Sequence, residues 1–429
     1  MPHIALALEG FFPENIGGTE HYVLNLAKEL RELNYRVSII KPSKQPQIHQ
    51  YQYDGFEVYC FPIAEKPTVK ELNGLEMPGG IEFFLEIIKN LNPDIFHLHS
   101  LGRALNTQHI KAVFEMSIKT VFTAHIGSNF CVRGNFMLFG KAQCNGLVDK
   151  HRCLACFINQ QKKMHSVVAK PISFVIRQLL LSISFVIKYP AFRIIDYKLE
   201  QISLIKKYSH VNIAIGDWLR EIYELNGLKN TVTIKQGIDK SFGQFESKKS
   251  KSSNKINLIF VGRMHPLKNL DLLIMVLKDF AGQINLIVVT IPFDEEMLYY
   301  QKVKKNYDDL GYTDWFENLT SPQVAEKMGE ADMLVLPSQY EVAPLVILEA
   351  FAKKIPVIGS DYIAIKEMIK HNVNGLLFKN GDSKSLKEQL LRLINEPELL
   401  HSLRQNIESV RTFKEVAAEH DVVYKKLVG

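Results

Sequence analysis

The sequence predicts an α/β protein of two domains, each built on a parallel sheet with helices on both faces. Apolar, strand-like runs alternate with helical patterns along the chain, and this alternation is typical of parallel sheets. The chain has 429 residues, which favours two domains of about 200 residues over one oversized core. Hydrophobic residues make up 46% and charged residues 23%, which is the balance of a folded globular protein.

The first domain is placed at residues 1–240. Helical patterns begin at Tyr22, Ile81, Leu105 and Asp217. A Cys-rich loop at 131–156 and a helical insertion at 165–208 interrupt the alternation. Buried strands are expected between the helices, at 3–8, 36–40, 94–98, 120–124, 211–214 and 232–234.

The second domain is placed at residues 241–411, after a polar segment at 247–254 that reads SKKSKSSN and predicts a linker. Ser321 and Pro322 are the expected N-cap and first-turn pair of one helix, and a C-terminal helix at 412–429 is expected to pack back on the first domain. Further helices are expected from Ser383 and from Glu396. Strands are expected at 256–261, 284–289, 333–336, 356–358 and 375–377.

Composition also bounds the location and the partners. The N-terminus lacks a basic segment followed by a small-residue cleavage site, so a cytoplasmic location is expected. The most apolar stretch, 171–190, is interrupted by Arg177, Gln178 and Lys188, so it could lie on the inner face of the cell membrane but is not expected to cross it. A buried helical insertion is the alternative. The net charge of +6 is modest, and no nucleic-acid motif is present.

The second domain opens with a strand that leads into Gly262-Arg263, followed by Lys268 just before a helix. A glycine lets the backbone turn closely, and the two cations can project into one anionic site. Fixed cations of this kind stabilise the charge that develops on a diphosphate leaving group. An ordinary solvated surface is the alternative reading of Arg263 and Lys268.

A second motif places Glu341 in a loop and Glu349 eight positions later on a helix. Pro344 fits the first turn of that helix, where its missing N–H costs little. The free amides of Leu345 and Val346 would then form an anion site. The alternative is an acidic residue that complements the helix dipole, with an unrelated second carboxylate.

With these motifs the chain resembles the large family of retaining glycosyltransferases with the GT-B fold, the family 4-like or group 1 glycosyltransferases. The resemblance covers essentially the whole chain. The family's G-R-x4-K motif corresponds to Gly262 through Lys268, and its E-x7-E motif to Glu341 through Glu349. Further matches lie at Gly17-Gly18, Gln236-Gly237-Ile238-Asp239, Ala350, Pro356-Val357, Glu367, Asn374-Gly375-Leu376 and Gly381-Asp382.

The resemblance implies two facing Rossmann-like domains and assigns roles to residues. Arg263 and Lys268 would hold the donor diphosphate, Glu349 the ribose and Glu341 the sugar. Gly18, beside Gly17, would approach the phosphates. His125, at a strand end, matches a histidine that contacts the donor sugar.

The implied partners are a UDP- or GDP-linked sugar donor and a glycan or lipid-linked glycan acceptor, as in synthesis of bacterial polysaccharide or lipopolysaccharide. The implied hexosyl transfer keeps the anomeric configuration and requires no cofactor.

Two departures concern the donor pocket. Where the family usually has G-F-G, this chain has Val342-Ala343-Pro344, and where the family has a glycine pair near position 363, it has Ile363-Ala364. The resemblance therefore does not specify which sugar the donor carries. Rival readings are a GT-B sugar-nucleotide epimerase or hydrolase and a non-catalytic GT-B scaffold. The intact charged set argues against the scaffold. A nicotinamide oxidoreductase is disfavoured because no G-x-G-x-x-G follows the strands at residue 3 or 256.

Four of the five cysteines lie in one loop region: Cys131, Cys144, Cys153 and Cys156. In a reducing cytosol such a set is more typical of metal binding than of disulfides. Four thiolates could close a tetrahedral structural zinc site, and free thiols are the alternative.

Overall fold

The structure, a computed structural model, describes residues 1–162, 166–179, 193–239, 255–280, 282–292, 296–312 and 314–429. It divides into two compact units. Unit 1 comprises Met1–Lys235 together with Lys414–Gly429, and unit 2 comprises Gln236–Phe413. The first change of unit along the chain thus lies between residues 235 and 236, and the sequence predicted it between 240 and 241. The polar segment expected as a linker, 247–254, lies outside the described residues.

Unit 1 is built on an eight-stranded sheet with the order β10-β9-β6-β5-β1-β2-β4-β3. Every neighbouring pair is parallel except β3 and β4. The strand order reverses between β1 and β5, where β1 has β2 on one side and β5 on the other. The bounds are β1 His3–Leu8, β2 Arg36–Ser43, β3 His49–Tyr53, β4 Phe56–Pro62, β5 Ile95–His99, β6 Lys119–Thr123, β9 Val211–Ala214 and β10 Thr231–Thr233.

The antiparallel hairpin of β3 and β4 was not anticipated from the sequence. Its turn is Asp54-Gly55, and both residues have positive φ, of 49° and 77°. Asp-Gly favours two-residue hairpin turns, because both central positions of such a turn need this left-handed backbone. The sequence therefore held a hairpin signal, and the expectation of an all-parallel sheet was wrong at this edge.

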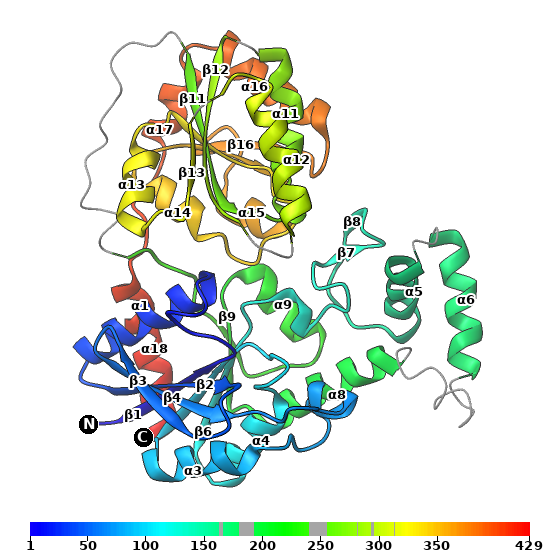
Figure 1. Cartoon of the computed structure of the whole chain (residues 1–429), viewed down its shortest axis with the longest axis vertical. Coiled ribbons are helices and arrows are strands. Elements are labelled where there is room, and N and C mark those ends of the chain that lie inside the picture. Colours follow the sequence, from blue (N-terminus) through cyan, green and yellow to red (C-terminus); the bar gives the residue numbers. More distant parts are fainter. Residues whose placement is uncertain (163–165, 180–192, 240–254, 281, 293–295, 313) are drawn as a thin grey trace. The chain divides into compact units, whose positions relative to one another are not determined.

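Helices cover both faces of this sheet (Figure 1). On one face, α3 and α4 contact each other and α4 contacts α8. Phe84 of α3 packs edge-on against Phe96 of β5, with the ring centroids 5.7 Å apart. On the other face, Tyr22 of α1 lies beside His420 of α18. The helix bounds are α1 Gly18–Glu32, α2 Val69–Leu72, α3 Ile81–Leu91, α4 Thr107–Glu115, α8 Ile194–Tyr208, α9 Asp217–Leu225 and α18 Phe413–Val428.

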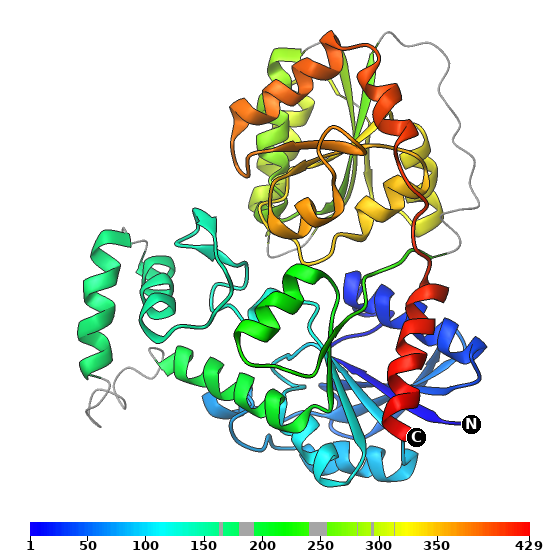
Figure 2. The ribbon, with the colours of Figure 1, turned by 180° about the vertical axis from the view of Figure 1, so that it is seen from behind.

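A helical and hairpin insertion projects from unit 1 between β6 and β9 (Figures 1 and 2). It holds the short strands β7 (Met137–Leu138) and β8 (Ala142–Gln143) and the helices α5 (Lys150–Lys162) and α6 (Ser166–Leu179). Helices α5 and α6 pack against each other. Part of the expected helical insertion, 180–192, lies outside the described residues. Within the described part of the chain, no helix is long and apolar enough to span a bilayer.

Unit 2 is built on a six-stranded parallel sheet with the order β13-β12-β11-β14-β15-β16. The strand order reverses between β11 and β14, so the loops that follow these two strands diverge at that point. The short edge strand β13 was not anticipated from the sequence. The bounds are β11 Ile256–Arg263, β12 Ile284–Ile291, β13 Trp315–Glu317, β14 Met333–Leu336, β15 Val357–Ser360 and β16 Gly375–Phe378.

The core of unit 2 lies between this sheet and α11, α12 and α16, with the fully buried Phe260, Leu273 and Leu386 among its members. Helices α13 and α14 contribute to a smaller cluster around Ala325. The N-cap of α13 is Thr320 rather than the expected Ser321, because the side chain of Gln323 accepts a hydrogen bond from the Thr320 amide. The helix bounds are α11 Leu270–Leu277, α12 Met297–Asp308, α13 Ser321–Gly329, α14 Leu345–Ala352, α15 Ile363–Met368, α16 Ser383–Asn395 and α17 Leu399–Gln405.

Candidate functional site

The candidate site of unit 2 lies at the carboxyl ends of β11 and β14, where the strand order reverses. Ligands of open parallel sheets bind in the crevice at such a point. The two loops are held together because the amide of Gln339 donates to the carbonyl of Leu267 at 2.8 Å. The loop after β14 is anchored in turn by Ser360, whose hydroxyl donates to the carbonyl of Ser338 at 2.6 Å. The backbone that carries the predicted site residues is therefore fixed on both sides of the crevice.

Lys268 and Glu341, which come from these two loops, form a direct ion pair. The distance from Nζ of Lys268 to Oε1 of Glu341 is 2.5 Å. Their side chains are 22% and 11% exposed, so the pair is shielded from water but not sealed. Lys268 ends a short 3-10 turn, Pro266–Lys268, and Asn269 follows with a φ of 58° before α11 begins. The structure thus brings together the two charged residues that the two motifs place far apart in the chain.

Gly262 and Arg263 lie at the end of β11 rather than in a turn after it, because the strand continues through Arg263. A Cβ atom at Gly262 would lie 3.3 Å from the Phe260 ring, so a larger residue would press on the core here. Arg263 is exposed. Burial lowers the pKa of His265, and the charges of Arg263 and Lys268 lower it further against the opposing effect of Glu296. The charges of Arg263 and Lys268 are therefore both felt at His265, just after β11.

Helix α14 begins beside Glu341 and carries the remaining predicted donor residues. Pro344 is its N-cap, not a residue of its first turn as expected. Leu345 and Val346 are the first two residues of the helix, and the amide of Ile347 is bonded back to the carbonyl of Pro344 at 3.1 Å. The amides of a first turn have no intrahelical acceptor, so they can bind an anion. Glu349 is partly buried, and burial raises its pKa to about 7.

Two hydroxyl groups at the carboxyl ends of the same sheet were missed by the sequence reading. Oγ of Ser338, after β14, and Oγ1 of Thr290, in β12, are buried and have no hydrogen-bond partner among the residues that the structure describes. A buried polar atom without a partner is costly, and a ligand can supply the missing partner. Both residues stand at strand ends, and this position was the only signal that could have found them.

In unit 1, His125 follows β6 and is held on both sides. Its amide donates a hydrogen bond to Oγ of Ser100 at 2.7 Å, and its Nε2 lies 3.0 Å from Nδ1 of His99. Tyr22 of α1 packs beside its ring, with the centroids 4.7 Å apart. Burial lowers the pKa of His125 to about 3, so the ring is neutral at physiological pH and can both donate and accept one hydrogen bond.

His125 belongs to a buried histidine cluster that the sequence reading did not identify. His97 lies on the same face of β5 as His99, and its Nδ1 is 2.7 Å from the hydroxyl of Tyr424 in α18. Nε2 of His99 is buried without a partner in the described part of the chain. Burial lowers the pKa of His97 and of His99 well below the usual value. The alternation in Phe96-His97-Leu98-His99 could have revealed this, because residues two apart in a strand share a face.

Gly17 and Gly18 lie after β1 at the same edge of the unit 1 sheet as His125. Gly17 is the N-cap of α1, with a φ of −164°, and Gly18 is the first residue of that helix. A Cβ atom at Gly18 would meet no other atom within 4 Å. Space is thus open beside the Cα of Gly18, and its contact with a phosphate stays a prediction.

The four clustered cysteines are all reduced, and Cys156 is the most buried of them. The amide of Phe139 donates to Sγ of Cys156 at 3.2 Å. Burial raises the pKa of Cys153 to about 11, which favours the thiol over the metal-binding thiolate. Among the described residues, no group of three or more His, Cys, Asp or Glu side chains is arranged to hold a metal ion. The geometry gives the zinc site no support, and it stays a prediction.

Comparison with known proteins identifies the class that this architecture defines. The Anabaena protein HepE, in a crystal structure with UDP and glucose, superposes with a TM-score of 0.65 at 14% identity, over 99% of this chain and 100% of that one. Such a likeness confirms the predicted GT-B fold. The family model for glycosyl transferases group 1 matches residues 242–410, and the model for glycosyltransferase family 4 matches residues 16–142. The sequence of unit 2 thus matches the group 1 glycosyltransferases, and that of unit 1 matches glycosyltransferase family 4.

Two relatives show the range of sequence similarity. An uncharacterized glycosyltransferase of Methanocaldococcus jannaschii is 26% identical over 206 residues, which are 47% of this chain and 55% of that protein. The amylovoran biosynthesis glycosyltransferase AmsK of Erwinia amylovora is 38% identical over 77 residues, 17% of this chain and 19% of that protein. The chain spans about half the length of the first curated relatives it matches.

Proposed function

We propose that this chain is a retaining glycosyltransferase that moves a hexosyl group from a UDP- or GDP-linked sugar to an acceptor hydroxyl. The observation that carries the proposal is the pairing of Lys268 with Glu341 at 2.5 Å, at the point where the strand order of unit 2 reverses and beside the start of α14. This arrangement offers a cation and helix amides to a diphosphate, and a carboxylate to the hydroxyls of a sugar.

The charge that develops on the leaving diphosphate is stabilised by four groups in this proposal. Arg263 and Lys268 supply positive charge, and the amides of Leu345 and Val346 supply hydrogen-bond donors. These groups are fixed before reaction, so they cost little reorganisation as the bond breaks. The proposal requires no metal ion for this step, because the protein's own cations and amides take that role.

The sugar and the ribose are recognised by carboxylates. Glu341 accepts hydrogen bonds from sugar hydroxyls, and Glu349, one turn into α14, accepts them from the ribose diol. In the transfer, the bond from the anomeric carbon to the phosphate oxygen breaks and the bond to the acceptor oxygen forms on the same face. The acceptor's proton passes to the leaving phosphate. Neutral His125 of unit 1 contributes a hydrogen bond to the sugar.

The relatives support the choice of pathway. AmsK is named for amylovoran biosynthesis, and another solved structure of similar fold is the lipopolysaccharide outer core galactosyltransferase WaaB. We therefore assign the chain to the synthesis of a cell-surface polysaccharide or lipopolysaccharide, with a glycan or lipid-linked glycan as acceptor. A cytoplasmic enzyme at the inner face of the membrane suits this task. Phe174, Val175 and Leu179 of α6 are exposed and form the surface that would rest on the lipid.

A thermal-shift screen against UDP, GDP, ADP and their sugar conjugates tests donor binding. Selective stabilisation by one nucleoside diphosphate is expected, and it should be lost in Arg263→Ala. No stabilisation by any of them would contradict the proposal. With the donor known, NMR of the product gives the anomeric configuration. Donor consumption without acceptor would instead indicate the epimerase or hydrolase alternative.

A further inference from the structure

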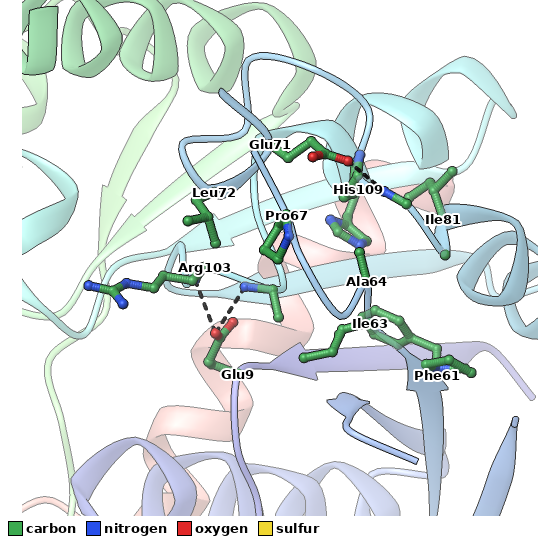
Figure 3. A pocket seen from close by; sticks show the side chains of 15 residues that line it. Glu9, Phe61, Ile63, Ala64, Pro67, Glu71, Leu72, Ile81, Arg103 and His109 are labelled. Carbon is green, nitrogen blue, oxygen red and sulfur yellow. Dashed lines mark hydrogen bonds between the residues drawn. The ribbon is translucent and has the colours of Figure 1, made fainter. Parts of the chain in front are cut away.

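Unit 1 contains a cavity of about 160 Å³ that none of the candidate site residues lines (Figure 3). Its wall is formed by the segment just after β1, the segment after β4 that leads into α3, and the loop after β5. The strand order of the unit 1 sheet reverses between β1 and β5, so the cavity borders the place where a parallel sheet binds its ligand.

The first of two carboxylates in the wall is already saturated by backbone donors. Glu9 accepts hydrogen bonds from the amides of Arg103, Ala104 and Leu105, at 3.0, 3.0 and 2.9 Å. Gly102 makes this possible, because a Cβ atom there would lie 1.9 Å from the Glu9 carboxylate. Glu9 therefore braces the β5 loop and has little capacity left for a ligand in the cavity.

The second carboxylate, Glu71, is engaged in the same way. It accepts hydrogen bonds from the amide of Thr68 at 2.6 Å and from the amide of Gly79 at 2.9 Å. These amides lower the pKa of Glu71, so it stays ionised while it holds the loop. His109, also in the wall, is neutral because burial lowers its pKa to about 3. Glu9 and Glu71 are thus committed to the fold and His109 is uncharged, while the side chain of Arg103, the fourth ionisable residue of the wall, extends away from the cavity (Figure 3).

The remaining wall is apolar. Figure 3 shows side chains from the three segments converging on the cavity, with Phe61, Ile63 and Ala64 on one side and Pro67 and Leu72 on another. A sugar ring would need polar partners here, and its hydroxyls would lose hydrogen bonds to water. A hydrocarbon group meets no such cost. A cavity of about 150 Å³ with apolar walls holds one benzene molecule, so this cavity fits a group of that size.

We propose that this cavity binds the hydrocarbon part of the acceptor, a group about the size of one benzene ring, and so selects acceptors that carry one. The inference rests on the proposed transferase function. Its support is the position of the cavity at the same carboxyl edge of the unit 1 sheet as Gly18 and His125, which are predicted to contact the donor. An acceptor anchored at this edge by its hydrocarbon group would present its sugar hydroxyl at the strand ends.

Binding of benzyl β-D-glucopyranoside to the full chain, with methyl β-D-glucopyranoside as the matched probe, tests the proposal. Saturation-transfer NMR titration measures both affinities. The benzyl probe should bind saturably with the strongest transfer at its ring protons, and the methyl probe should not. Ala64→Phe fills the cavity, and Ile63→Asp places a charge in its wall. Each should weaken the benzyl probe about tenfold or more, the equivalent of about two buried methylene groups.

Ala142→Phe is the matched control, because Ala142 is exposed on β8, outside the cavity wall. It should leave benzyl binding unchanged. The proposal is overturned if the wild-type chain shows no saturable binding of the benzyl probe, or if both cavity variants, folded by circular dichroism, bind it as the wild type does.

The nucleotide response of the same proteins separates this inference from the proposed function. If nucleoside diphosphates stabilise the chain but the cavity variants keep benzyl binding, the cavity assignment fails alone. If the benzyl probe binds in the cavity but no nucleotide stabilises the chain, the transferase function fails and the acceptor assignment fails with it.

Discussion

Nζ of Lys268 lies 2.5 Å from Oε1 of Glu341, although 73 positions separate the two residues in the chain. Each residue belongs to a different loop of the crevice in unit 2, and the hydrogen bond from the amide of Gln339 to the carbonyl of Leu267 holds these loops together. The pair fixes the direction of both side chains. A diphosphate that binds Lys268 and a sugar that binds Glu341 would thereby be presented to each other in one orientation.

Lys268→Ala and Glu341→Ala should each abolish transfer while leaving the fold intact. The pair is partly exposed, so a double-mutant cycle of urea unfolding should give a coupling of only about 1 kcal/mol. Each single variant is thus expected to lose transfer activity with little change in its free energy of unfolding. Near-normal turnover in either single variant would refute the site assignment.

Glu349→Gln should stabilise the chain at high pH. Burial raises the pKa of Glu349 from 4.5 to about 7, so the native state keeps a proton between these values that the unfolded state loses. The unfolding free energy of the wild type therefore falls as the pH rises through this window. The variant has no carboxyl group to ionise at this position. Its unfolding free energy should therefore exceed that of the wild type by about 1–3 kcal/mol above pH 7, and should equal it near pH 4.5.

Urea unfolding at pH 4.5 and pH 8 measures this difference. Glu388→Gln, at an exposed position of α16, is the control and should show no such gain. In donor titrations Glu349→Gln should also bind more weakly, because an amide is a poorer acceptor for the ribose diol than a carboxylate. An equal gain at both pH values would show that burial does not hold the proton on Glu349.

The buried histidines should make the chain sensitive to acid. The pKa of His125 is lowered from 6.5 to about 3, so unfolding takes up a proton between these values and the native state loses stability as the pH falls. In His125→Gln this proton uptake on unfolding is absent, because glutamine does not titrate. Its loss of stability between pH 6.5 and pH 4.5 should be smaller than that of the wild type by about 1 kcal/mol per pH unit.

His151→Gln is the matched control, since His151 is exposed on α5. It should follow the wild type at every pH. His125→Gln should in addition lower transfer at pH 7, where the change in stability is small. Identical acid sensitivity of His125→Gln and the wild type would show that His125 does not resist protonation in the native state.

The zinc prediction concerns Cys131, Cys144, Cys153 and Cys156. If these residues bind zinc as thiolates, the purified chain should contain about one equivalent by elemental analysis, and a chelator should destabilise it. A metal-free chain of unchanged stability would reject zinc and leave four thiols. A thiol titration of the unfolded protein checks that the cysteines are reduced.

Much of the fold could be predicted because its signals are local. The strand β1 has the bounds expected from its apolar run, and α3 begins at the expected Ile81, since each element is specified by its own residues. The short strand β13 was missed because three partly buried residues carry too little pattern. The turn at Asp54-Gly55 was a readable signal that was overlooked.

The candidate site was predictable to a different degree in each unit. The charged residues of unit 2 stand in spaced motifs, so the sequence named them, but their pairing depends on the order of β11 and β14 in the sheet, which no local pattern encodes. The partners of His125 depend on tertiary packing as well. His99 comes from the neighbouring strand, and Tyr424 reaches His97 from the far end of the chain.

Helix α18 has a consequence for synthesis. The segment Lys414–Gly429, which holds nearly all of this helix, completes unit 1, although the ribosome makes it after all of unit 2. The fully buried His420 and Tyr424 thus reach their neighbours last. Domains usually fold in the order in which they emerge. In this chain unit 2 can fold before unit 1 is complete. Until α18 is synthesised, the face of unit 1 around His97 stays uncovered and accessible to chaperones.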